Sequence, residues 1–537
     1  MPTMNGAEAL IASLAEEGVE IIFGLPGVQV MEALDAVYRQ PKIRWVSVRH
    51  EQTAAYMAFG YARTTGKIGV ALVVPGPGAL NTTAAIGTAY ATSTPVLLVS
   101  GQVESYNLGR KCGALHEISE QKDVFAPLTK WCHCATRVED IPGTVQMAMY
   151  HLRTGRPRPV ELEILWDVMQ NSASVDMLEP KPVVMAAPEP TQISAAAQAL
   201  SNAQRPVIWA GGGVISSDAA KELTLIAECL NAPVITTPEG KGAIPGRHPI
   251  SLGVYYYGHG PAKRTIPQAD VILAVGSRLH LTPNAPISFN DGKKLIQIDI
   301  DADEVGRNWP VYVGIASDAR TALRSLLDAL PEKGRSTWSP EELEEIKAET
   351  ARELSKLAPL QLEIVRTIRS ELNDDDIVIP GITNIGYWSL LSYPVLSPRT
   401  YCTTSYFATL GYAFPTALGA QMGNPNKRVV AICGDGGFMY ALPDLATAVQ
   451  EGINVIALVF TDQAFGASLH DQQRRFQSRI IGTRFHNPNF ASIAEAFGAR
   501  GIRLSGPEEL SKGLKMALRE ARPTVVEIPV PTMATPF

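Results

Sequence analysis

The chain contains a strand–helix–strand unit in which each of two apolar strands runs into a carboxylate. The first expected strand, Val429 to Cys433, leads into Gly434-Asp435-Gly436-Gly437, and the second, Asn454 to Phe460, leads into Thr461-Asp462. The pattern between them predicts an amphipathic helix from about Ala441 to Glu451. Because parallel strands joined by a helix end at the same edge of a sheet, both acids are expected where open α/β sheets bind ligands.

These two acids have the chemistry of a cation and phosphate site. Carboxylate oxygens are ligands that Mg²⁺ prefers, and a glycine-rich turn lets backbone amides approach a phosphate. A lone Gly-Asp-Gly is also common in ordinary turns. The interpretation as a ligand site therefore depends on the spacing from Asp435 to Asp462 and to Phe465-Gly466. The sequence therefore predicts a Mg²⁺–diphosphate site at Asp435 and Asp462.

A second motif lies near the N-terminus. The run His50 to Tyr56 follows an apolar strand, and the alanine-rich segment up to Arg63 predicts a helix with Glu51 in its first turn. An acid at that place often does no more than complement the helix dipole, which contributes about 0.3–1 kcal/mol. Glycine- and proline-rich loops flank this unit at Phe23 to Gly27 and at Pro75 to Asn81.

Together these motifs resemble those of the thiamine diphosphate (ThDP) enzymes of the acetolactate synthase, pyruvate decarboxylase and benzoylformate decarboxylase group. One family signature is Gly-Asp-Gly followed by an Asn-Asn or Asn-Asp pair; in this chain Thr461 replaces the first Asn. A second family motif, H-E-x-x-A-x-x-x-A-x-G-Y-A-R, matches His50 to Arg63 almost completely. The resemblance covers nearly the whole chain. It implies an α/β protein of three doubly wound parallel-sheet domains, the ThDP-binding fold, assembled as a homodimer or homotetramer.

The resemblance also implies roles for individual residues. Asp435, the side chain of Asp462 and the backbone carbonyl of Ala464 would hold Mg²⁺. Glu51 would hydrogen-bond the aminopyrimidine of ThDP and drive its tautomerisation, and Leu410 would be the apolar wedge under the bent cofactor. The residues expected to contact ThDP are Gly27, Pro75, Asn81, Thr383, Asn384, Ala408 through its carbonyl, Leu410, Gly434, Gly436, Gly437, Phe465 and Gly466.

Expected strands and helices alternate along the rest of the chain, which is typical of parallel α/β sheets. The 537 residues suggest about three domains. A proline-rich linker at 171–190 separates a domain at 1–170, which the resemblance implies to be pyrimidine-binding, from a middle domain at 191–335. A charged connecting helix at 336–356 then leads to a domain at 357–537, which the resemblance implies to be the diphosphate- and Mg-binding domain.

The middle domain carries a glycine-rich turn, Gly211-Gly212-Gly213, before a helix expected from Ser217 to Leu230. The turn lacks the G-x-G-x-x-G spacing of a dinucleotide loop, and no acid stands in the expected place after a second strand, which favours a simple tight turn. Acetolactate synthases carry FAD on this domain. The segment Gly276 to Pro283 lacks the Asp-Asp-Arg run typical of the FAD-binding members, which makes FAD doubtful here.

Charge and cysteine usage narrow the class of partner. The formal net charge of −6 predicts no basic surface for nucleic acid. No signal peptide or membrane span is expected from the apolar stretches, so we expect a cytoplasmic protein with small-molecule partners and without nucleic-acid or membrane partners. The cysteines follow neither a disulfide framework nor a common zinc spacing: Cys112, Cys132, Cys134, Cys229, Cys402 and Cys433.

The expected substrate pocket differs from that of a standard acetolactate synthase. Those enzymes have Phe-Gln where this chain has Leu115-His116, and Met and Trp where it has Ala467 and Asp471. Benzoylformate decarboxylase uses two histidines, of which His280 matches one and Val74 replaces the other. The positions that line the pocket in relatives are Val28, Val74, Leu115, His116, His280, Ala467, Ser468 and Asp471.

Asp471 has two interpretations. It could recognise a hydroxyl or cationic group on a larger 2-oxo acid, because a buried carboxylate needs a partner. It could instead pair with Arg474 one turn away on the same helix and leave specificity unchanged.

The candidate catalytic residues are Glu51, Leu410, His116 and His280. The two histidines are included because a histidine titrates near neutrality and can move a proton.

These features predict a ThDP- and Mg²⁺-dependent 2-oxo acid decarboxylase or carboligase. Loss of CO₂ would leave a carbanion/enamine on ThDP, to be protonated or transferred to the carbonyl of an aldehyde or second 2-oxo acid. A C–C lyase or acyltransferase acting on a sulfo- or acyl-CoA substrate is an alternative, although no basic cradle for a nucleotide is visible. A catalytically silent ThDP-binding regulatory subunit is another, and an intact Glu51 argues against it.

Overall fold

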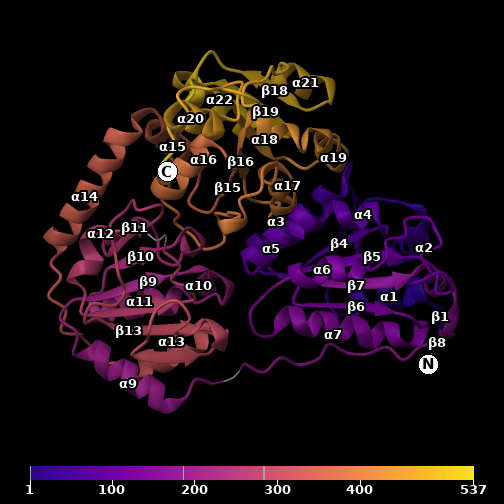
Figure 1. Ribbon diagram of the computed structural model, residues 1–537, viewed down its shortest axis with the longest axis horizontal. Helices are drawn as coiled ribbons and strands as arrows, with labels where there is room; N and C mark the ends of the chain where they lie inside the picture. Colours follow the sequence, from indigo (N-terminus) through magenta and orange to yellow (C-terminus); the bar gives the residue numbers. More distant parts are fainter. Residues whose placement is uncertain (1, 186, 282–284) are drawn as a thin grey trace.

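Parallel β-sheets surrounded by helices make up the N-terminal, middle and C-terminal parts of the chain (Figure 1). The computed structural model describes residues 2–185, 187–281 and 285–537, and within these ranges each part contains one parallel sheet. The three parallel-sheet α/β domains expected from the sequence are confirmed.

The N-terminal sheet is formed almost entirely by buried apolar strands, as expected for a sheet covered on both faces. In spatial order its strands are β3 (Arg44–Ser47), β2 (Ile21–Gly24), β4 (Gly69–Val73), β5 (Val96–Gln102), β7 (Val160–Leu165) and β6 (Trp131–Ala135). Its helices are α1 (Gly6–Glu16), α2 (Met31–Tyr38), α3 (Glu51–Thr65), α4 (Pro77–Asn81), α5 (Thr83–Ala91), α6 (Gln121–Phe125), α7 (Ile141–Arg153) and α8 (Trp166–Gln170). A short antiparallel pair, β1 (Thr3–Asn5) and β8 (Ser172–Ser174), brings the first residues of the expected linker into this domain.

Helix α3 begins at Glu51 because the preceding residue caps it. The His50 side chain accepts a hydrogen bond from the Gln52 amide through Nδ1, at 3.1 Å. The helix ends at Gly66, whose φ of 76° is left-handed. Nearly every residue of α3 is buried, so its apolar, alanine-rich composition reflects contacts on all sides.

The N-terminal and C-terminal domains are joined through α3 and α17 (Ala413–Gly423). A Cβ atom on Gly60 would lie 2.0 Å from the Thr416 carbonyl oxygen, and one on Gly419 would lie 1.9 Å from that of Met57. The two helices therefore meet backbone to backbone, and one hydrophobic core continues through both domains. This contact fixes Glu51 relative to the C-terminal sheet.

The middle domain is a second doubly wound sheet. In spatial order its strands are β11 (Ser251–Val254), β10 (Val234–Thr236), β9 (Pro206–Ala210), β12 (Val271–Val275), β13 (Lys294–Asp299) and β14 (Val313–Ala316). Its helices are α9 (Pro190–Ser201), α10 (Gly212–Ser216), α11 (Ala220–Leu230), α12 (Ala262–Thr265) and α13 (Ala319–Ala329). The helix expected from Ser217 begins at Ala220, after the short α10.

The long charged helix α14 (Pro340–Leu357) connects the middle domain to the C-terminal domain along one side of the molecule (Figure 1). Ser339 caps it by accepting from the Glu342 amide at 3.2 Å. Within the described ranges every helix is too short or too polar to cross a lipid bilayer.

The C-terminal sheet places the two expected acids at one edge. Its strands, in spatial order, are β15 (Ile377–Pro380), β16 (Val429–Gly434), β17 (Ile456–Thr461), β19 (Thr524–Pro529) and β18 (Arg500–Arg503). Its helices are α15 (Pro359–Ser370), α16 (Asn384–Ser392), α17, α18 (Asp435–Met439), α19 (Leu445–Glu451), α20 (Gly466–Arg475), α21 (Phe490–Ala496) and α22 (Leu510–Arg519). The helix expected from Ala441 to Glu451 is present as α19 but starts four residues later, because a 3-10 turn at Leu442–Asp444 precedes it; α18, which starts directly at Asp435, was not expected.

Two glutamates are buried side by side on β7. Glu161 and Glu163 project from the same face of the strand, are almost inaccessible to solvent, and face Ser100 and Gln102 on β5. Burial raises the pKa of both carboxyls, and the charge of Glu163 raises that of Glu161 further. The folded state therefore favours the protonated form of this pair.

Replacing Glu161 with Gln should make the protein more stable at high pH. A folded pKa above the unfolded value means that the stabilisation is complete below about pH 4.5 and is lost as pH rises through the folded pKa. We expect the melting temperature of Glu161→Gln, measured from pH 5 to pH 8, to exceed that of the wild type by a margin that grows with pH. Glu344→Gln, an exposed acid on α14, is the control. A margin independent of pH would contradict the buried-acid account.

Candidate active site

Asp435 lies at the end of β16 with its carboxylate enclosed by hydrogen-bond donors. Its Oδ1 accepts from the amide of Gly436 at 2.8 Å. Its Oδ2 accepts from the amides of Asp462 and Gln463, at 3.1 and 2.8 Å, and from Asn487 Nδ2 at 2.7 Å. These four donors orient the carboxylate and leave Oδ1 with fewer bonds than Oδ2.

The second acid, Asp462, follows the adjacent strand β17. Burial raises the pKa of Asp435, while its hydrogen-bond donors oppose the increase. Burial and then the charge of Asp435 raise the pKa of Asp462 to about 6. Asp435 is buried and Asp462 is partly buried, and their negative charges repel each other. A cation would therefore be favoured here.

The donor set fits Mg²⁺. Asp435 and Asp462 supply hard oxygen atoms, and Ala464 lies two residues beyond Asp462 in the turn that Gln463 begins with a left-handed φ of 54°. In the described part of the chain, no cluster of three or more His, Cys, Asp or Glu side chains could hold a metal. A cation here would therefore complete its coordination with backbone oxygen and with oxygen atoms from outside the chain, such as those of a diphosphate.

Glycines keep the turn after β16 open. A Cβ on Gly436 would lie 2.8 Å from the Phe465 ring, whereas one on Gly437 would meet its nearest neighbour, the Gly411 nitrogen, at 3.7 Å. Space beside Gly437 is thus free for a ligand to approach the backbone. A Cβ on Gly466 would lie 2.5 Å from Asp462 Oδ2, and one on Gly434 would lie 2.7 Å from Thr383 Oγ1. Side chains at either glycine would displace expected ligands.

Thr383 and Asn384 stand at the start of α16, at the same sheet edge. The Thr383 hydroxyl faces Gly434, as a diphosphate ligand requires. The amide nitrogen of Asn384, however, donates to the carbonyls of Met533 and Ala534 at 2.8 and 2.9 Å. In this conformation Asn384 holds the C-terminal segment, and its side-chain oxygen is buried without a partner among the described residues.

The backbone conformation of Ala408 and the partial burial of Leu410 are consistent with contact to a cofactor. Ala408 adopts a left-handed φ of 49°, a conformation that is sparsely populated for residues other than glycine and concentrates at functional sites. Leu410 is only half-buried, and it is not among the residues that pack into the hydrophobic core clusters. Its partly buried side chain, outside these clusters, is consistent with the expected role of an apolar wedge.

Glu51 is held in a second group of residues, in the N-terminal domain. It is 9% exposed, and Asn81 Nδ2 donates to its Oε2 at 2.9 Å. A Cβ on Gly78 would approach Glu51 Oε1 to 3.7 Å, and the same atom would collide with Val74. Asn81, expected to contact the cofactor, therefore orients Glu51 in this structure, and Val74 forms a wall beside it.

The loop that carries Leu115 and His116 packs against this group. His116 Nδ1 lies 2.7 Å from Gln29 Oε1, and Gln29 Nε2 donates to the Leu115 carbonyl at 2.8 Å. Val28 and Leu115 are both more than half exposed. Val74 and the His116 backbone thus lie close to the α4 turn beside Glu51. Gly27 lies next to Val74, because a Cβ there would meet the Val74 side chain at 2.4 Å.

His280 lies apart from the group around Glu51, at a cavity that Ala408 also lines. It is exposed in the middle domain and lines a cavity of about 940 Å³ between the three domains. The Gly211–Gly213 turn also lines this cavity and packs tightly, since a Cβ on Gly211 would lie 2.2 Å from the Gly276 carbonyl. Thr282 and Pro283, which belong to the segment that makes FAD doubtful, lie outside the described residues.

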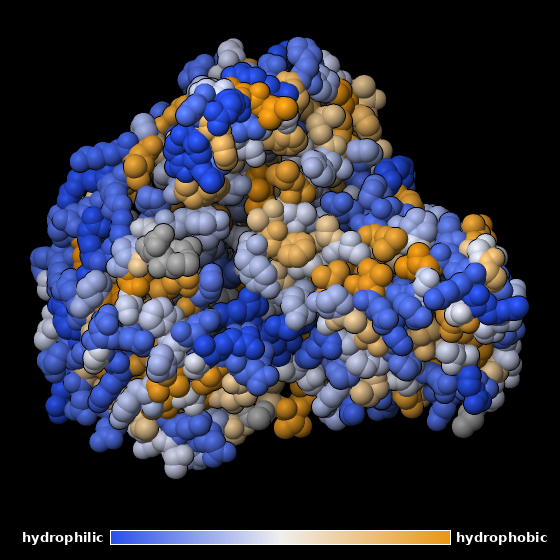
Figure 2. Space-filling view, in the orientation of Figure 1, coloured by the Kyte–Doolittle hydropathy of each residue, from blue (hydrophilic) through white to orange (hydrophobic). Residues whose placement is uncertain are grey.

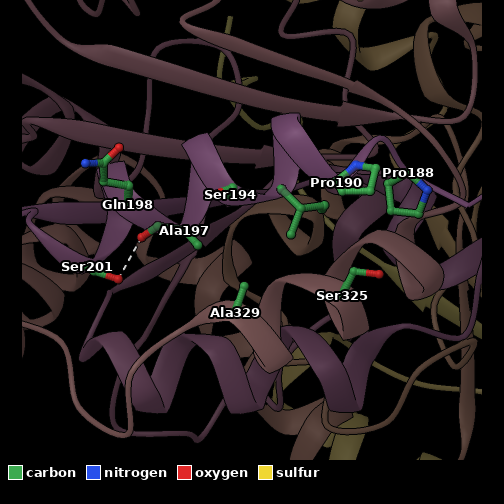
Figure 3. A pocket seen from close by; sticks show the side chains of 9 residues that line it. Pro188, Pro190, Ser194, Ala197, Gln198, Ser201, Ser325 and Ala329 are labelled. Atoms are coloured by element: carbon green, nitrogen blue, oxygen red, sulfur yellow. Dashed lines mark hydrogen bonds between the residues drawn. The ribbon is translucent and has the colours of Figure 1, made fainter.

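Another hollow, of about 630 Å³, lies between α9 and α13 (Figure 3). Prolines, alanines, serines and one glutamine line it, and the labelled hydrogen bond between Ser201 and Ala197 is an ordinary contact within α9. None of these side chains is a carboxylate, imidazole or thiol. This hollow therefore offers no side chain for acid–base or nucleophilic chemistry.

The C-terminal pocket residues lie on α20. Asp471 pairs with Arg475 at 3.1 Å and with Arg474 at 3.9 Å, and its side chain is 37% exposed. Of the two interpretations of Asp471, the structure shows pairing on its own helix. Ala467 is partly buried and Ser468 is exposed on the same helix.

Sequence motifs did not identify two residues of this site. Asn487 lies 52 residues beyond Asp435, to which it donates, and the Phe485 ring packs at 5.0 Å against that of Phe465 in an edge-to-face arrangement. Both come from the segment after α20, which pairs with the metal loop through the Ala464–Arg484 bridge. The absence of regular periodicity there left no signal for this pairing.

Comparisons with known proteins agree with the fold and the site. The thiamine pyrophosphate enzyme family, named for another term for ThDP, matches in three parts: its N-terminal TPP binding domain at residues 4–124, its central domain at 193–326 and its C-terminal TPP binding domain at 381–528. The chain belongs to this family of enzymes.

Curated relatives are similar along nearly their whole length. The chain is 34% identical to a probable acetolactate synthase large subunit of Methanocaldococcus jannaschii, over 99% of this chain and 93% of that protein. It is 32% identical to the acetolactate synthase large subunit of Haemophilus influenzae, over 96% and 92%, and 33% identical to a probable 2-ketoarginine decarboxylase of Pseudomonas aeruginosa, over 98% and 94%. The protein is therefore an acetolactate synthase-like, thiamine diphosphate-dependent enzyme.

Proposed function

We propose that the protein uses ThDP and Mg²⁺ to remove CO₂ from a 2-oxo acid, and that it either releases an aldehyde or joins the remaining fragment to an acceptor carbonyl. The observation that supports this most is the pair Asp435 and Asp462 at one sheet edge, together with the buried, amide-oriented Glu51. When bound, ThDP supplies the nucleophilic carbon and the electron sink for decarboxylation.

The residues of the chain would divide the remaining work. Asp435, Asp462 and the Ala464 carbonyl would hold the cation, and the amides beside Gly437 would face the diphosphate. Glu51 would exchange a proton with the aminopyrimidine. Its burial and its hydrogen bond from Asn81 hold the carboxylate in place for this exchange. The apolar walls at Val74 and Leu410 would exclude water.

A second copy of the chain would complete the site. Each half is held by residues of its own domain, and apolar side chains are exposed beside both halves: Val28, Leu80 and Leu115 near Glu51, and Met439, Tyr440, Phe476, Ile480 and Ile481 near Asp435. Figure 2 shows apolar surface around α5, beside the C-terminal domain. Such a patch is typical of a protein interface. We therefore propose a homodimer, or a homotetramer built from it, that joins Glu51 of one copy to Asp435 of the other.

The substrate is proposed to be a small 2-oxo acid. The relatives named above are acetolactate synthases and a probable 2-ketoarginine decarboxylase, which sets the range of 2-oxo acids to test.

The proposed compartment is the cytoplasm. All six cysteines are free thiols, which is consistent with a reducing compartment.

A panel of 2-oxo acids tests the function. Pyruvate, 2-oxobutyrate and the guanidino acid 2-ketoarginine would each be supplied with ThDP and Mg²⁺, with and without an aldehyde acceptor. CO₂ and acyloin would be followed together. We expect CO₂ release from at least one donor that requires both ThDP and Mg²⁺; CO₂ that appears equally without either one, or no CO₂ from any donor, contradicts the proposal.

The same panel tests Asp471. Because the carboxylate already pairs with Arg474 and Arg475, Asp471→Ala should leave the ranking of donors unchanged, and the lost surface ion pairs should change stability by about 1 kcal/mol or less. A selective rise of KM for the cationic donor would show that Asp471 reaches the substrate.

A further inference from the structure

The turn before α4 is held by a single buried glutamine. Gly76 adopts φ 59° and ψ −114°, and a Cβ there would lie 2.3 Å from the His116 carbonyl oxygen, so this position requires glycine. Its amide donates to Gln121 Oε1 at 2.7 Å. Gln121, in α6, is 1% exposed. The turn that carries Pro75 and Gly76 is therefore attached to the interior of the domain through Gln121.

Acceptors on its other side fix the orientation of the Gln121 amide. Gln121 Nε2 lies 3.0 Å from Ser100 Oγ, 3.2 Å from the Gly101 carbonyl and 3.3 Å from Glu163 Oε1. The Ser100 hydroxyl in turn donates to Glu161 Oε1 at 2.8 Å. Reversal of the amide would bring its oxygen against these acceptors and its nitrogen against the Gly76 amide, which would leave buried groups unsatisfied.

The short helix α4 connects this turn to Glu51. It begins directly after Gly76, and its last residue, Asn81, donates to Glu51 Oε2. A displacement of Gly76 would thus move Asn81 and the wall formed by Gly78 beside the Glu51 carboxylate. A misplacement of about 1 Å at a reacting group can reduce a rate about 100-fold.

We propose that Gln121 is a positioning residue for Glu51, acting through Gly76, α4 and Asn81, and that Ser100 and the buried pair Glu161 and Glu163 hold Gln121 in the one orientation that serves this role. The inference rests on the proposed function of Glu51. Gln121 itself contacts no expected cofactor or substrate group.

Gln121→Met tests the proposal, because methionine fills a similar volume but makes none of these hydrogen bonds. Gln297→Met is a matched control: Gln297 is also buried, accepts from a glycine amide (Gly306, 2.9 Å) and donates to two carbonyls, but it lies in the middle domain. The measurements are amide hydrogen exchange of residues 76–81 without cofactor, the Kd of ThDP with Mg²⁺, and kcat on the best donor of the panel.

In Gln121→Met, exchange at 76–81 should accelerate by about 10-fold or more, and kcat should fall by about 10- to 100-fold. The Kd of ThDP should change much less than kcat, because most of the expected cofactor contacts, including the diphosphate and cation residues, are in another domain. Gln297→Met should leave all three quantities near their wild-type values. If Gln121→Met does not fold, Ser100→Ala is measured instead and should show the same changes in smaller degree.

Unchanged exchange at 76–81 overturns the proposal, and so does faster exchange with unchanged kcat. A kcat loss accompanied by an equal loss of ThDP affinity also overturns it, since that result indicates general damage to the fold. If the wild type itself releases no ThDP-dependent CO₂, the proposed function fails, and the exchange measurement still reports separately whether Gln121 holds the turn.

Discussion

Asp435→Ala is expected to abolish retention of ThDP and, with it, all activity. The substitution removes an oxygen ligand for the cation and leaves the amides of Asp462 and Gln463 and the Asn487 side chain without their acceptor. Loss of groups that only orient a metal ligand already costs about 10- to 100-fold in affinity. The Kd of ThDP with Mg²⁺, measured by calorimetry or by quenching of protein fluorescence, should therefore rise by more than about 100-fold.

A buried acid at the opposite end of the same sheet provides the control. Asp376 is 4% exposed and accepts from the amides of Asn373 and Arg428, before β15 begins. Asp376→Ala should lower stability but leave the Kd of ThDP close to that of the wild type. Asp435→Ala protein that binds ThDP with Mg²⁺ as tightly as the wild type would show that the cation lies elsewhere.

Glu51→Gln, in contrast, should bind ThDP normally but catalyse proton exchange on it very slowly. Glutamine keeps the shape of the side chain and can still meet Asn81, but it cannot exchange a proton. We expect the Kd of ThDP to be nearly unchanged, and deuterium exchange at the reactive carbon of bound ThDP, followed by NMR, to slow by about 10²- to 10⁴-fold.

Glu222→Gln is a suitable comparison for Glu51→Gln. Glu222 is a buried acid of the middle domain, held by Arg320 and Arg324, and its replacement should leave the exchange rate of bound ThDP unaltered. Wild-type exchange in Glu51→Gln would remove Glu51 from the mechanism, even if the cation site were correct.

Local sequence rules predicted the parts of the site that lie at the ends of regular elements. Asp435 and Asp462 follow parallel neighbouring strands, so the βαβ rule was sufficient to bring them together. Glu51 follows a capping residue at the start of an alanine-rich helix, which the pattern also indicated. The start of the helix expected at 441–451 was wrong because Pro443 lies in a 3-10 turn, and the short helix formed by Asp435 and the glycines after it was missed.

Contacts between distant segments could not be predicted in the same way. Asn487 reaches Asp435 from an irregular segment, and Asn384 is bonded to a carbonyl 150 residues away. Gln121 reaches Gly76 from a helix of five residues. Such bonds depend on how loops fold over the sheet edge, and periodicity and capping carry no information about that.

Mixing two inactive variants tests most directly whether Glu51 and Asp435 act together in one site built from two copies. Glu51→Gln and Asp435→Ala proteins would be dissociated, combined in equal amounts and reassembled, and CO₂ release with ThDP and Mg²⁺ would then be measured. In a mixed dimer, one site combines both substitutions and the other contains both native residues. The account predicts recovery of roughly a quarter of the wild-type rate under random pairing. A mixture that assembles into dimers but stays as inactive as its components would contradict it.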